Sequence, residues 1–125
     1  MTVVADATTG KLLAGRAETA RGVWAQFKGL MGRADLPRDH GLVLPRTRGV
    51  HTHFMRFAID VVFYDKDSVV VGVEHALRPW RLSAYHLRAK AAVELPAGTL
   101  RTSDTRVGHV LSITELDSKI GRAHV

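Results

Sequence analysis

The sequence predicts an α+β domain in which strands predominate. We expect a small curled or barrel-like sheet of antiparallel or mixed strands, with one N-terminal helix packed on it. Short runs rich in valine, isoleucine and leucine recur between turn residues, and a single segment shows helical periodicity. The length of 125 residues fits one domain.

The first elements expected are a hairpin and the helix. Residues 2–18 predict a β-hairpin, because "TVVADA" and "KLLAGRAE" flank the polar turn "TTG". A helix is predicted over about 20–31, where apolar residues recur with a period of 3.6. Thr19 can cap its start, and Gly32 follows its end. The apolar face consists of Val23, Trp24, Phe27, Leu30 and Met31.

The rest of the domain is predicted to be strands, separated by loops that contain proline or glycine. The run "AIDVVFYD" is apolar almost throughout, which suits a strand buried on both faces. It is followed by a short turn and by "SVVVGVEHAL", which we expect to pair back as a hairpin. The predicted strands are 41–45, 49–55, 58–65, 68–77, 89–98 and 107–116.

Charge and composition narrow the classes of function. The net charge is +6 and the pI about 10.3, which raises the question of nucleic acid. The arginines are nevertheless spread along the sequence, with Arg46/Arg48 and Arg78/Arg81 as the closest groups. A basic nucleic-acid-associated module therefore stays a second alternative. The lack of cysteine excludes disulfides and thiol nucleophiles.

Neither a signal peptide nor an apolar run of membrane-spanning length is recognisable, so a cytoplasmic protein without a membrane span is the default expectation. The sequence gives no indication of oligomeric state. The last six residues, "IGRAHV" (120–125), back-translate as ATC-GGA-AGA-GCA-CAC-GTC, which reads like a sequencing adapter. We interpret them as an assembly artefact rather than a polar tail, and assign the domain to residues 1–119.

The densest group of chemically versatile side chains is "HTHFMRFAID" (51–60). Residues two apart share one face of a strand, so His51, His53 and Met55 are expected to line up. Imidazole and thioether groups suit copper, and imidazole alone suits zinc or nickel, but a site needs three or four ligands. A metal site at His51 and His53 is therefore a weak alternative to a hydrogen-bonded structural histidine, and no cofactor is expected.

Two carboxylates stand within apolar runs, Asp60 in "FAIDVVF" and Glu94 in "AAVELPAG". A buried carboxylate needs a partner, and Arg56 or the backbone amides of a turn can supply one for Asp60. Near a histidine the two carboxylates would suit general acid–base catalysis. The alternative, which we favour, is that each holds a loop or bulge by hydrogen bonds.

Trp80 lies between arginines in the predicted loop "RPWRLSAYHLR" (78–88). A tryptophan in such a loop acts either as a lid on the core or as a stacking surface for a ligand. Arg78, two residues before it, would then meet an anionic group.

Several motifs occur together in one order: "FKGLMGR", "GLVLP", "HTHFMRFAIDVVFYDKDSVV", "LRPW" and "AAVELPAGT". In this combination the chain resembles the domain of unknown function 192 family, from about residue 10 to 113. The matching positions are 29–31, Met55, Asp60, Phe63, Glu94, Leu95 and Gly98. His53 departs from the family pattern, which usually has an aromatic residue there. The resemblance implies a compact, largely β fold and supplies no catalytic residues.

The first functional hypothesis is a non-enzymatic domain that binds a small anionic molecule or a peptide. Its site would comprise the polar residues beside the apolar strand, together with arginines that meet the anion. The candidates are His51, Met55, Arg56, Asp60, Arg78, Trp80 and Glu94. The alternative is a metal-dependent or carboxylate-based hydrolase that uses His51/His53 and Asp60/Glu94, so enzymatic activity is left open.

Overall fold

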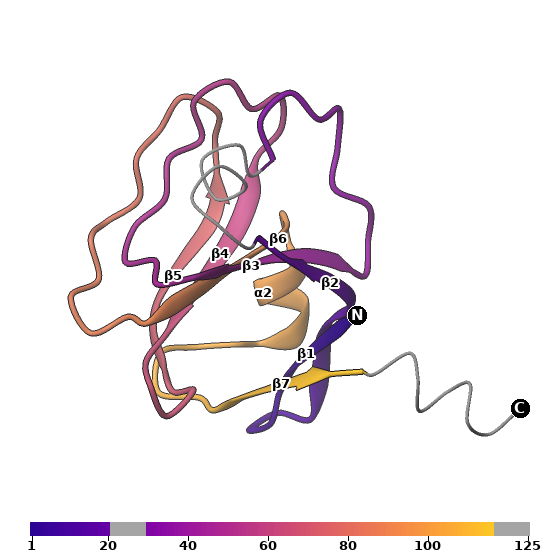
Figure 1. Ribbon diagram of the computed structural model, residues 1–125, viewed down its shortest axis with the longest axis vertical. Helices are drawn as coiled ribbons and strands as arrows, with labels where there is room; N and C mark the ends of the chain where they lie inside the picture. Colours follow the sequence, from indigo (N-terminus) through magenta and orange to yellow (C-terminus); the bar gives the residue numbers. More distant parts are fainter. Residues whose placement is uncertain (21–29, 117–125) are drawn as a thin grey trace, which may run out of the picture.

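The computed structural model describes residues 1–20 and 30–116. These residues form one sheet of seven strands and a short helix (Figure 1). None of the helices in the described part of the chain is long and apolar enough to span a membrane. The elements are β1 (Thr2–Asp6), β2 (Lys11–Thr19), β3 (His40–Pro45), β4 (Ile59–Tyr64), β5 (Val70–Leu77), β6 (Ala91–Pro96), α2 (Thr99–Ser103) and β7 (Leu111–Glu115).

The sheet is mixed and curls toward a barrel. Its strand order is β5-β4-β6-β3-β2-β1-β7, and every neighbouring pair is antiparallel except the parallel pair β2 and β3. The two ends of this order approach each other, because Val69 and Val110 form a bridge before β5 and β7. Around this bridge the amide of Val70 donates to the carbonyl of His109 at 2.8 Å. These contacts give a curled half-barrel.

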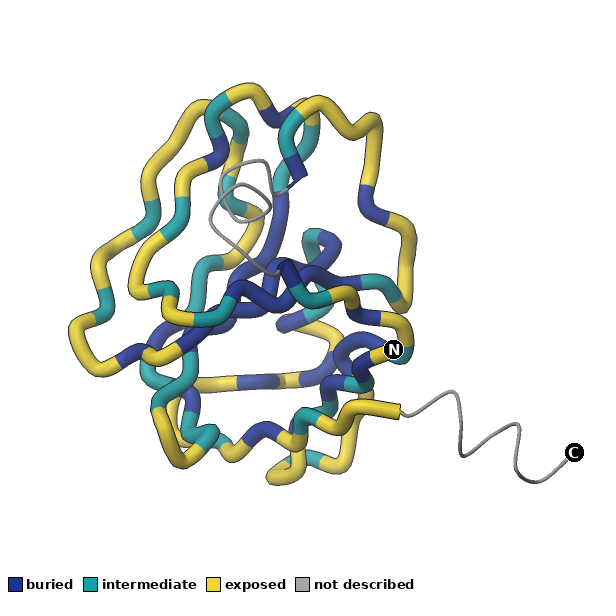
Figure 2. The backbone as a smooth tube through the Cα atoms, viewed as in Figure 1, coloured by how far each residue is buried: buried dark blue, intermediate teal, exposed yellow. Residues whose placement is uncertain are grey.

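The curl creates two apolar clusters, one on each face of the sheet. The inner cluster gathers side chains from strands at both ends of the order, such as Val70 and Leu111, together with Leu100 of α2. The outer cluster contains Ile59, Val61 and Phe63 of β4, which point away from the inner cluster because strand side chains alternate. Loop residues such as Leu36 and Ala89 cover this outer face, and the exposed residues in Figure 2 lie largely in the loops. Strand β4 is therefore buried on both faces, as its sequence predicts.

The hairpin of β1 and β2, the hairpin of β4 and β5, and the strands at β3, β6 and β7 confirm the predicted mostly-β class. The predicted N-terminal helix over about 20–31 is not supported. Residues 21–29 lie outside the described residues, and Leu30 and Met31 belong to a turn. The helix that the structure describes, α2, comes between β6 and β7. The segment 120–125 also lies outside the described residues.

The predicted strand at 49–55 is wrong. His51 forms one isolated bridge to Leu82, and the chain then turns. The amide of Met55 donates to the carbonyl of Thr52 at 3.2 Å, and Phe54 adopts a left-handed φ of 66°. A bulky residue with positive φ ends a regular strand. The expected line of His51, His53 and Met55 along one strand face is therefore not formed.

Candidate functional site

Two long loops, residues 46–56 and 78–90, run side by side above the sheet (Figure 1). Their backbones are paired as in a short irregular ribbon. The amide of Ser83 donates to the carbonyl of Val50 at 2.9 Å, and the amide of Val50 donates to the Ser83 hydroxyl at 2.9 Å. Further along, the amide of His86 donates to the carbonyl of Arg48 at 2.8 Å. The two loops therefore behave as one unit, which we call the loop pair.

Thr52 is the centre of the loop pair. Its side chain is fully buried, and its Oγ1 donates to the carbonyl of Arg78 at 2.6 Å and accepts from the amide of Arg81 at 2.8 Å. Its carbonyl accepts from the amides of Met55 and Trp80, at 3.2 and 3.0 Å. One threonine thus satisfies backbone groups in both loops, which otherwise would be costly to bury.

The loop pair is attached to the sheet through His86. Its ring packs against Phe63 with a centroid distance of 4.3 Å, and it covers the backbone of Gly72 on β5. Among the described residues, no hydrogen-bond partner reaches its buried Nε2 atom. Packing rather than hydrogen bonding therefore holds this ring in place.

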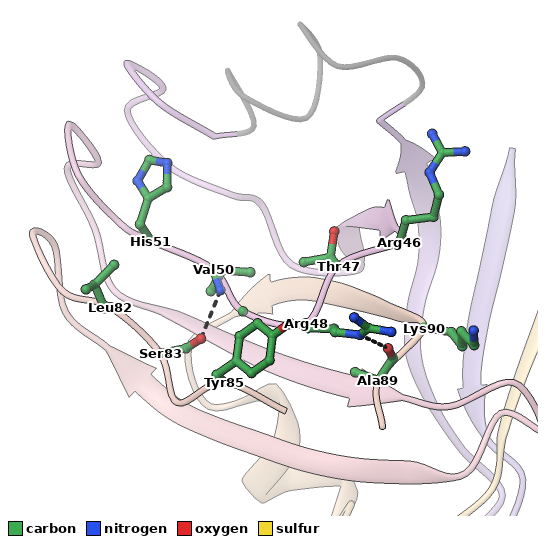
Figure 3. Close-up of a pocket in the computed structure, with 11 residues that line it drawn as sticks. Arg46, Thr47, Arg48, Val50, His51, Leu82, Ser83, Tyr85, Ala89 and Lys90 are labelled. Atoms are coloured by element: carbon green, nitrogen blue, oxygen red, sulfur yellow. Dashed lines mark hydrogen bonds between the residues drawn. The ribbon is translucent and has the colours of Figure 1, made fainter. Parts of the chain in front are cut away.

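A cavity of about 840 Å³ opens between the two loops (Figure 3). Its volume lies in the range of small-molecule sites, roughly 300–1,000 Å³. Three cations line it, Arg46, Arg48 and Lys90, and the Arg48 Nε donates to the carbonyl of Ala89 at 3.4 Å. Leu82 and Tyr85 supply an apolar wall. No carboxylate is among the lining residues of the described chain, so the cavity is suited to an anion that also carries apolar surface.

The loop pair concentrates charge that the sequence shows as scattered. Residues 46–56 and 78–90 hold seven of the 18 lysines and arginines and none of the 12 acidic residues. The rest of the chain is therefore close to neutral. One carboxylate approaches from outside, since Glu74 of β5 accepts from the amide of Ala84 at 2.9 Å. The net charge of +6 is thus a property of this one region.

The seven residues predicted from sequence as a ligand site fall into three places. His51 lines the cavity. Arg56, Arg78 and Trp80 are exposed on the loop pair outside that lining, and Trp80 packs against Phe54 and His53. Three of the seven are buried in the body of the domain: Met55, Asp60 and Glu94. The structure therefore does not bring the seven residues together.

Asp60 is saturated by backbone amides. One carboxylate oxygen accepts from Ala76 at 2.8 Å, and the other accepts from Gly98 at 3.0 Å and Leu100 at 2.9 Å. The side chain is only 1% exposed. It thus fixes an irregular part of β5 to the turn that begins α2, which is the structural role that the sequence favours over catalysis.

Glu94 points into the outer apolar cluster. It pairs with Leu42 on β3 and with Val61 on β4, and both neighbours belong to that cluster. No described residue gives its carboxyl group a hydrogen bond. Burial raises the pKa of Glu94 to about 7. The group is therefore held near the boundary between its neutral and charged forms at physiological pH.

The four residues of the hydrolase alternative do not converge. Asp60 lies opposite Leu95 of the inner cluster, whereas Glu94 lies opposite Val61 of the outer cluster, so the two carboxylates point to opposite faces of the sheet. The rings of His51 and His53 are 5.3 Å apart, and the amide of His53 donates to His51 Nδ1 at 3.3 Å. Among the described residues, no three His, Asp or Glu side chains are grouped for metal binding.

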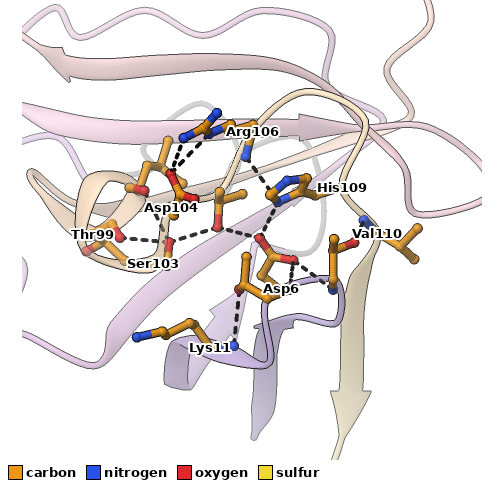
Figure 4. A network of polar contacts seen from close by, with 12 residues as sticks. Asp6, Lys11, Thr99, Ser103, Asp104, Arg106, His109 and Val110 are labelled. Atoms are coloured by element: carbon orange, nitrogen blue, oxygen red, sulfur yellow. Dashed lines mark hydrogen bonds and ion pairs between the residues drawn. The ribbon is translucent and has the colours of Figure 1, made fainter.

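A second polar network, which the sequence did not indicate, ties β1 to the start of β7 (Figure 4). The buried carboxylate of Asp6 accepts from the amides of Thr8 and Thr9, and bonds Thr105 Oγ1 and His109 Nδ1, each at 2.8 Å. Burial raises the pKa of Asp6, but the hydrogen bonds from His109, Thr105 and Thr9 outweigh it and leave the pKa below its usual value. The Ser103 hydroxyl is hydrogen-bonded to Thr105 Oγ1 rather than to His109. The described network therefore does not have the serine–histidine contact that a nucleophilic serine requires.

The charged and large exposed cavity residues that were not predicted from the sequence are Arg46, Arg48, Leu82, Tyr85 and Lys90. They come from segments more than 30 residues apart, which only the loop pairing brings together. The available signal was the two close arginine groups, Arg46/Arg48 directly after Pro45 and Arg78/Arg81 on either side of Pro79. That pattern predicts two basic loops, but it does not predict that the two loops contact each other.

Proteins of similar sequence include UPF0127 proteins of Thermococcus and Pyrococcus species. The Thermococcus sibiricus protein is 33% identical over 105 residues, which cover 81% of this chain and 68% of the relative. The Pyrococcus furiosus protein is 37% identical over 108 residues, which cover 82% and 90% of the two chains.

Two solved structures share the fold. A Novosphingobium aromaticivorans protein of unknown function has a TM-score of 0.77 at 21% identity, covering 89% of this chain and 82% of its own. A Sinorhizobium meliloti protein proposed to be a transcription regulator has a TM-score of 0.71 at 22% identity, with coverages of 89% and 90%. The family profile of DUF192, described as "Uncharacterized ACR", matches residues 4–113. The chain therefore belongs to the DUF192 family.

Proposed function

We propose that the protein is a non-enzymatic binding domain, and that the cavity of the loop pair takes up a small anionic molecule or an acidic peptide. The observation that supports this is a cavity of about 840 Å³ lined by Arg46, Arg48 and Lys90, with no carboxylate among the described lining residues. Guanidinium groups match phosphate and carboxylate oxygens in pairs, which gives such a site both affinity and orientation.

The apolar part of the cavity favours a ligand with a ring or chain beside its charge. Leu82 and Tyr85 are 73% and 67% exposed and form one side of the cavity. Their burial by a ligand would add apolar contact to the ionic contact. This chemistry differs from that of the site drawn from the sequence, because only His51 of those candidates lines the cavity.

A carboxylate-based hydrolase is less well supported. Asp60 already accepts three backbone hydrogen bonds, and Glu94 points to the other face of the sheet. A catalytic pair needs both groups within hydrogen-bond reach of one substrate, or one water molecule away.

The proposal is tested by thermal unfolding in the presence of inorganic phosphate and of aromatic and aliphatic phosphate and carboxylate compounds. A ligand at 100 times its Kd is expected to stabilise the fold by roughly 2.7 kcal/mol. Arg48→Gln should abolish the shift, whereas Arg101→Gln, which removes the same charge outside the cavity, should keep it. Equal shifts in both variants, or no shift with any compound, would contradict the proposal.

A further inference from the structure

The loop pair also carries an unusual amount of exposed apolar surface. Half of the ten large hydrophobic side chains that are exposed in the described structure belong to it, including all three aromatic ones. They are between 54% and 73% exposed. We call them the apolar ridge, which consists of Phe54, Trp80, Leu82, Tyr85 and Leu87.

Contacts along the loop pair connect four of the five ridge residues, partly through His51 and His53. The rings of Phe54 and Trp80 lie 4.8 Å apart, and Trp80 meets His53 edge-on at 5.4 Å. His53 neighbours His51, which is bridged to Leu82, and Leu82 lines the same cavity as Tyr85. Exposed apolar side chains gathered in one region in this way are typical of an interaction site.

The fold holds two of these rings outward in unfavourable backbone conformations. Phe54 and Trp80 have φ values of 66° and 62°, which bulky residues rarely adopt. The carbonyl of Thr52 accepts hydrogen bonds from the amides of Met55 and Trp80, and so fixes both turns. Strain that surrounding contacts maintain is typical of functional surfaces.

The same loops also carry positive charge. They hold seven lysines and arginines and no acidic residue, as described above. Aromatic and aliphatic side chains beside arginine and lysine are the composition of protein surfaces that bind the headgroup region of membranes. Trp and Tyr in particular are enriched at that depth.

We propose that the loop pair docks on the surface of an anionic lipid bilayer. The apolar ridge would enter the headgroup and acyl boundary, and Arg46, Arg48 and Lys90 would bind lipid phosphates. This inference rests on the proposed function, because it identifies the anion of the cavity as a lipid headgroup. It concerns peripheral binding and needs no membrane-spanning segment.

Single-stranded nucleic acid would also bind the positive charge of the loop pair, but it is less well matched to the apolar ridge. Bases bind by stacking on open aromatic faces. The exposed rings of Trp80 and Phe54 lie against each other, and two of the five ridge residues, Leu82 and Leu87, offer a base no ring to stack on. The aliphatic share of the ridge therefore favours lipid.

The test is sedimentation of the full chain with vesicles of phosphatidylcholine alone and of phosphatidylcholine mixed with phosphatidylglycerol. Binding is expected only to the mixed vesicles and should weaken as salt is raised. Trp80→Ser with Leu82→Ser should reduce binding at least tenfold. Arg46→Gln and Arg48→Gln should each reduce it about fivefold.

Two exposed residues outside the loop pair provide matched controls, Leu12→Ser and Arg101→Gln, and neither should change binding. Unchanged thermal midpoints would show that the ridge variants fold. Equal binding to both vesicle types, or binding that the ridge variants leave intact, overturns the inference.

The same variants separate this inference from the proposed function. If Arg48→Gln abolishes a thermal shift with inorganic phosphate and the protein does not sediment with vesicles, the anion site is supported and membrane docking is contradicted. If the protein binds vesicles but not soluble phosphate, membrane docking is supported and the site for a small soluble ligand is contradicted. Tight binding of a fluorescent oligothymidylate that is insensitive to Leu82→Ser would assign the surface to nucleic acid instead and overturn docking.

Discussion

The imidazole ring of His86 occupies the space that a side chain at Gly72 would need. A Cβ atom built on Gly72 would overlap this ring, and Phe63 packs against the ring with a centroid distance of 4.3 Å. The absence of a side chain on one strand therefore determines where a loop more than ten residues away is attached.

We expect Gly72→Ala to destabilise the protein by about 2 kcal/mol, because an extra methyl group in a packed site forces its neighbours to move. Gly49→Ala is the control, since a Cβ there meets its nearest atoms only at 3.6 Å. Urea unfolding at neutral pH measures both. In Gly72→Ala combined with His86→Ala, the loss should be smaller than the sum of the single losses. Additive losses would show that the two residues do not compete for space.

Asp60→Asn should destabilise the fold by roughly 3 kcal/mol. The carboxylate accepts three backbone hydrogen bonds. The asparagine side chain has one oxygen that can accept, and its NH2 group would face the backbone N–H groups that the second oxygen now binds. Asp67→Asn, at an exposed turn position, serves as the control and should change stability by less than about 0.5 kcal/mol. Chemical unfolding of both variants provides the comparison. Wild-type stability in Asp60→Asn would remove Asp60 from the structural role assigned to it.

Glu94 should make stability fall as pH rises toward neutrality. Its pKa is about 7 in the fold and 4.5 as an ordinary glutamate, so between these values the folded state binds more protons than the unfolded state. At about 1.4 kcal/mol per pKa unit, the loss is on the order of 3 kcal/mol across this window and is complete above pH 7.

Glu94→Gln cannot ionise and should lose this dependence. The difference in unfolding free energy between the variant and wild type, measured from pH 4 to pH 8, is therefore expected to grow in favour of the variant. A difference that stays constant over this range would show that Glu94 is charged in the folded protein.

Thr105→Val should weaken the fold by about 2 kcal/mol at neutral pH, since it removes one hydrogen bond to the buried Asp6 carboxylate. The pKa of Asp6 is lowered, so this residue stabilises the fold above its ordinary value of 3.8, and the contribution is lost as pH falls through the folded pKa. Acid unfolding of Thr105→Val should therefore begin at higher pH.

The control is Thr114→Val, at an exposed position on β7, which should behave as wild type. Equal acid midpoints for the two variants would refute the role of the network.

Local patterns predict most of the strands of this fold but not its candidate site. The strand β4 follows from its apolar run, and the first hairpin from its polar turn, because neighbouring residues determine both. The cavity depends on loops joined by bonds between Val50 and Ser83 and between Arg48 and His86. Such contacts between distant segments leave no periodic signal in the sequence.

The "HTHFM" segment shows how a correct local preference can mislead. Its β-prone residues predict a strand, but the carbonyl of Thr52 is bonded within a turn, and the positive φ of Phe54 reverses the chain. The two histidines are therefore close without forming a ligand row. Asp60 was more predictable, because an isolated carboxylate in an apolar run must have hydrogen-bond donors near it.

The attachment of the two loops to each other has a consequence for how this family can diversify. Most of the bonds that join them are made by main-chain atoms and by Thr52, Ser83 and His86. The side chains at positions 46, 48, 82, 85 and 90, which line the cavity, take little part in that framework. If the cavity binds the ligand that we propose, substitution at these positions would alter ligand preference while the scaffold keeps its shape.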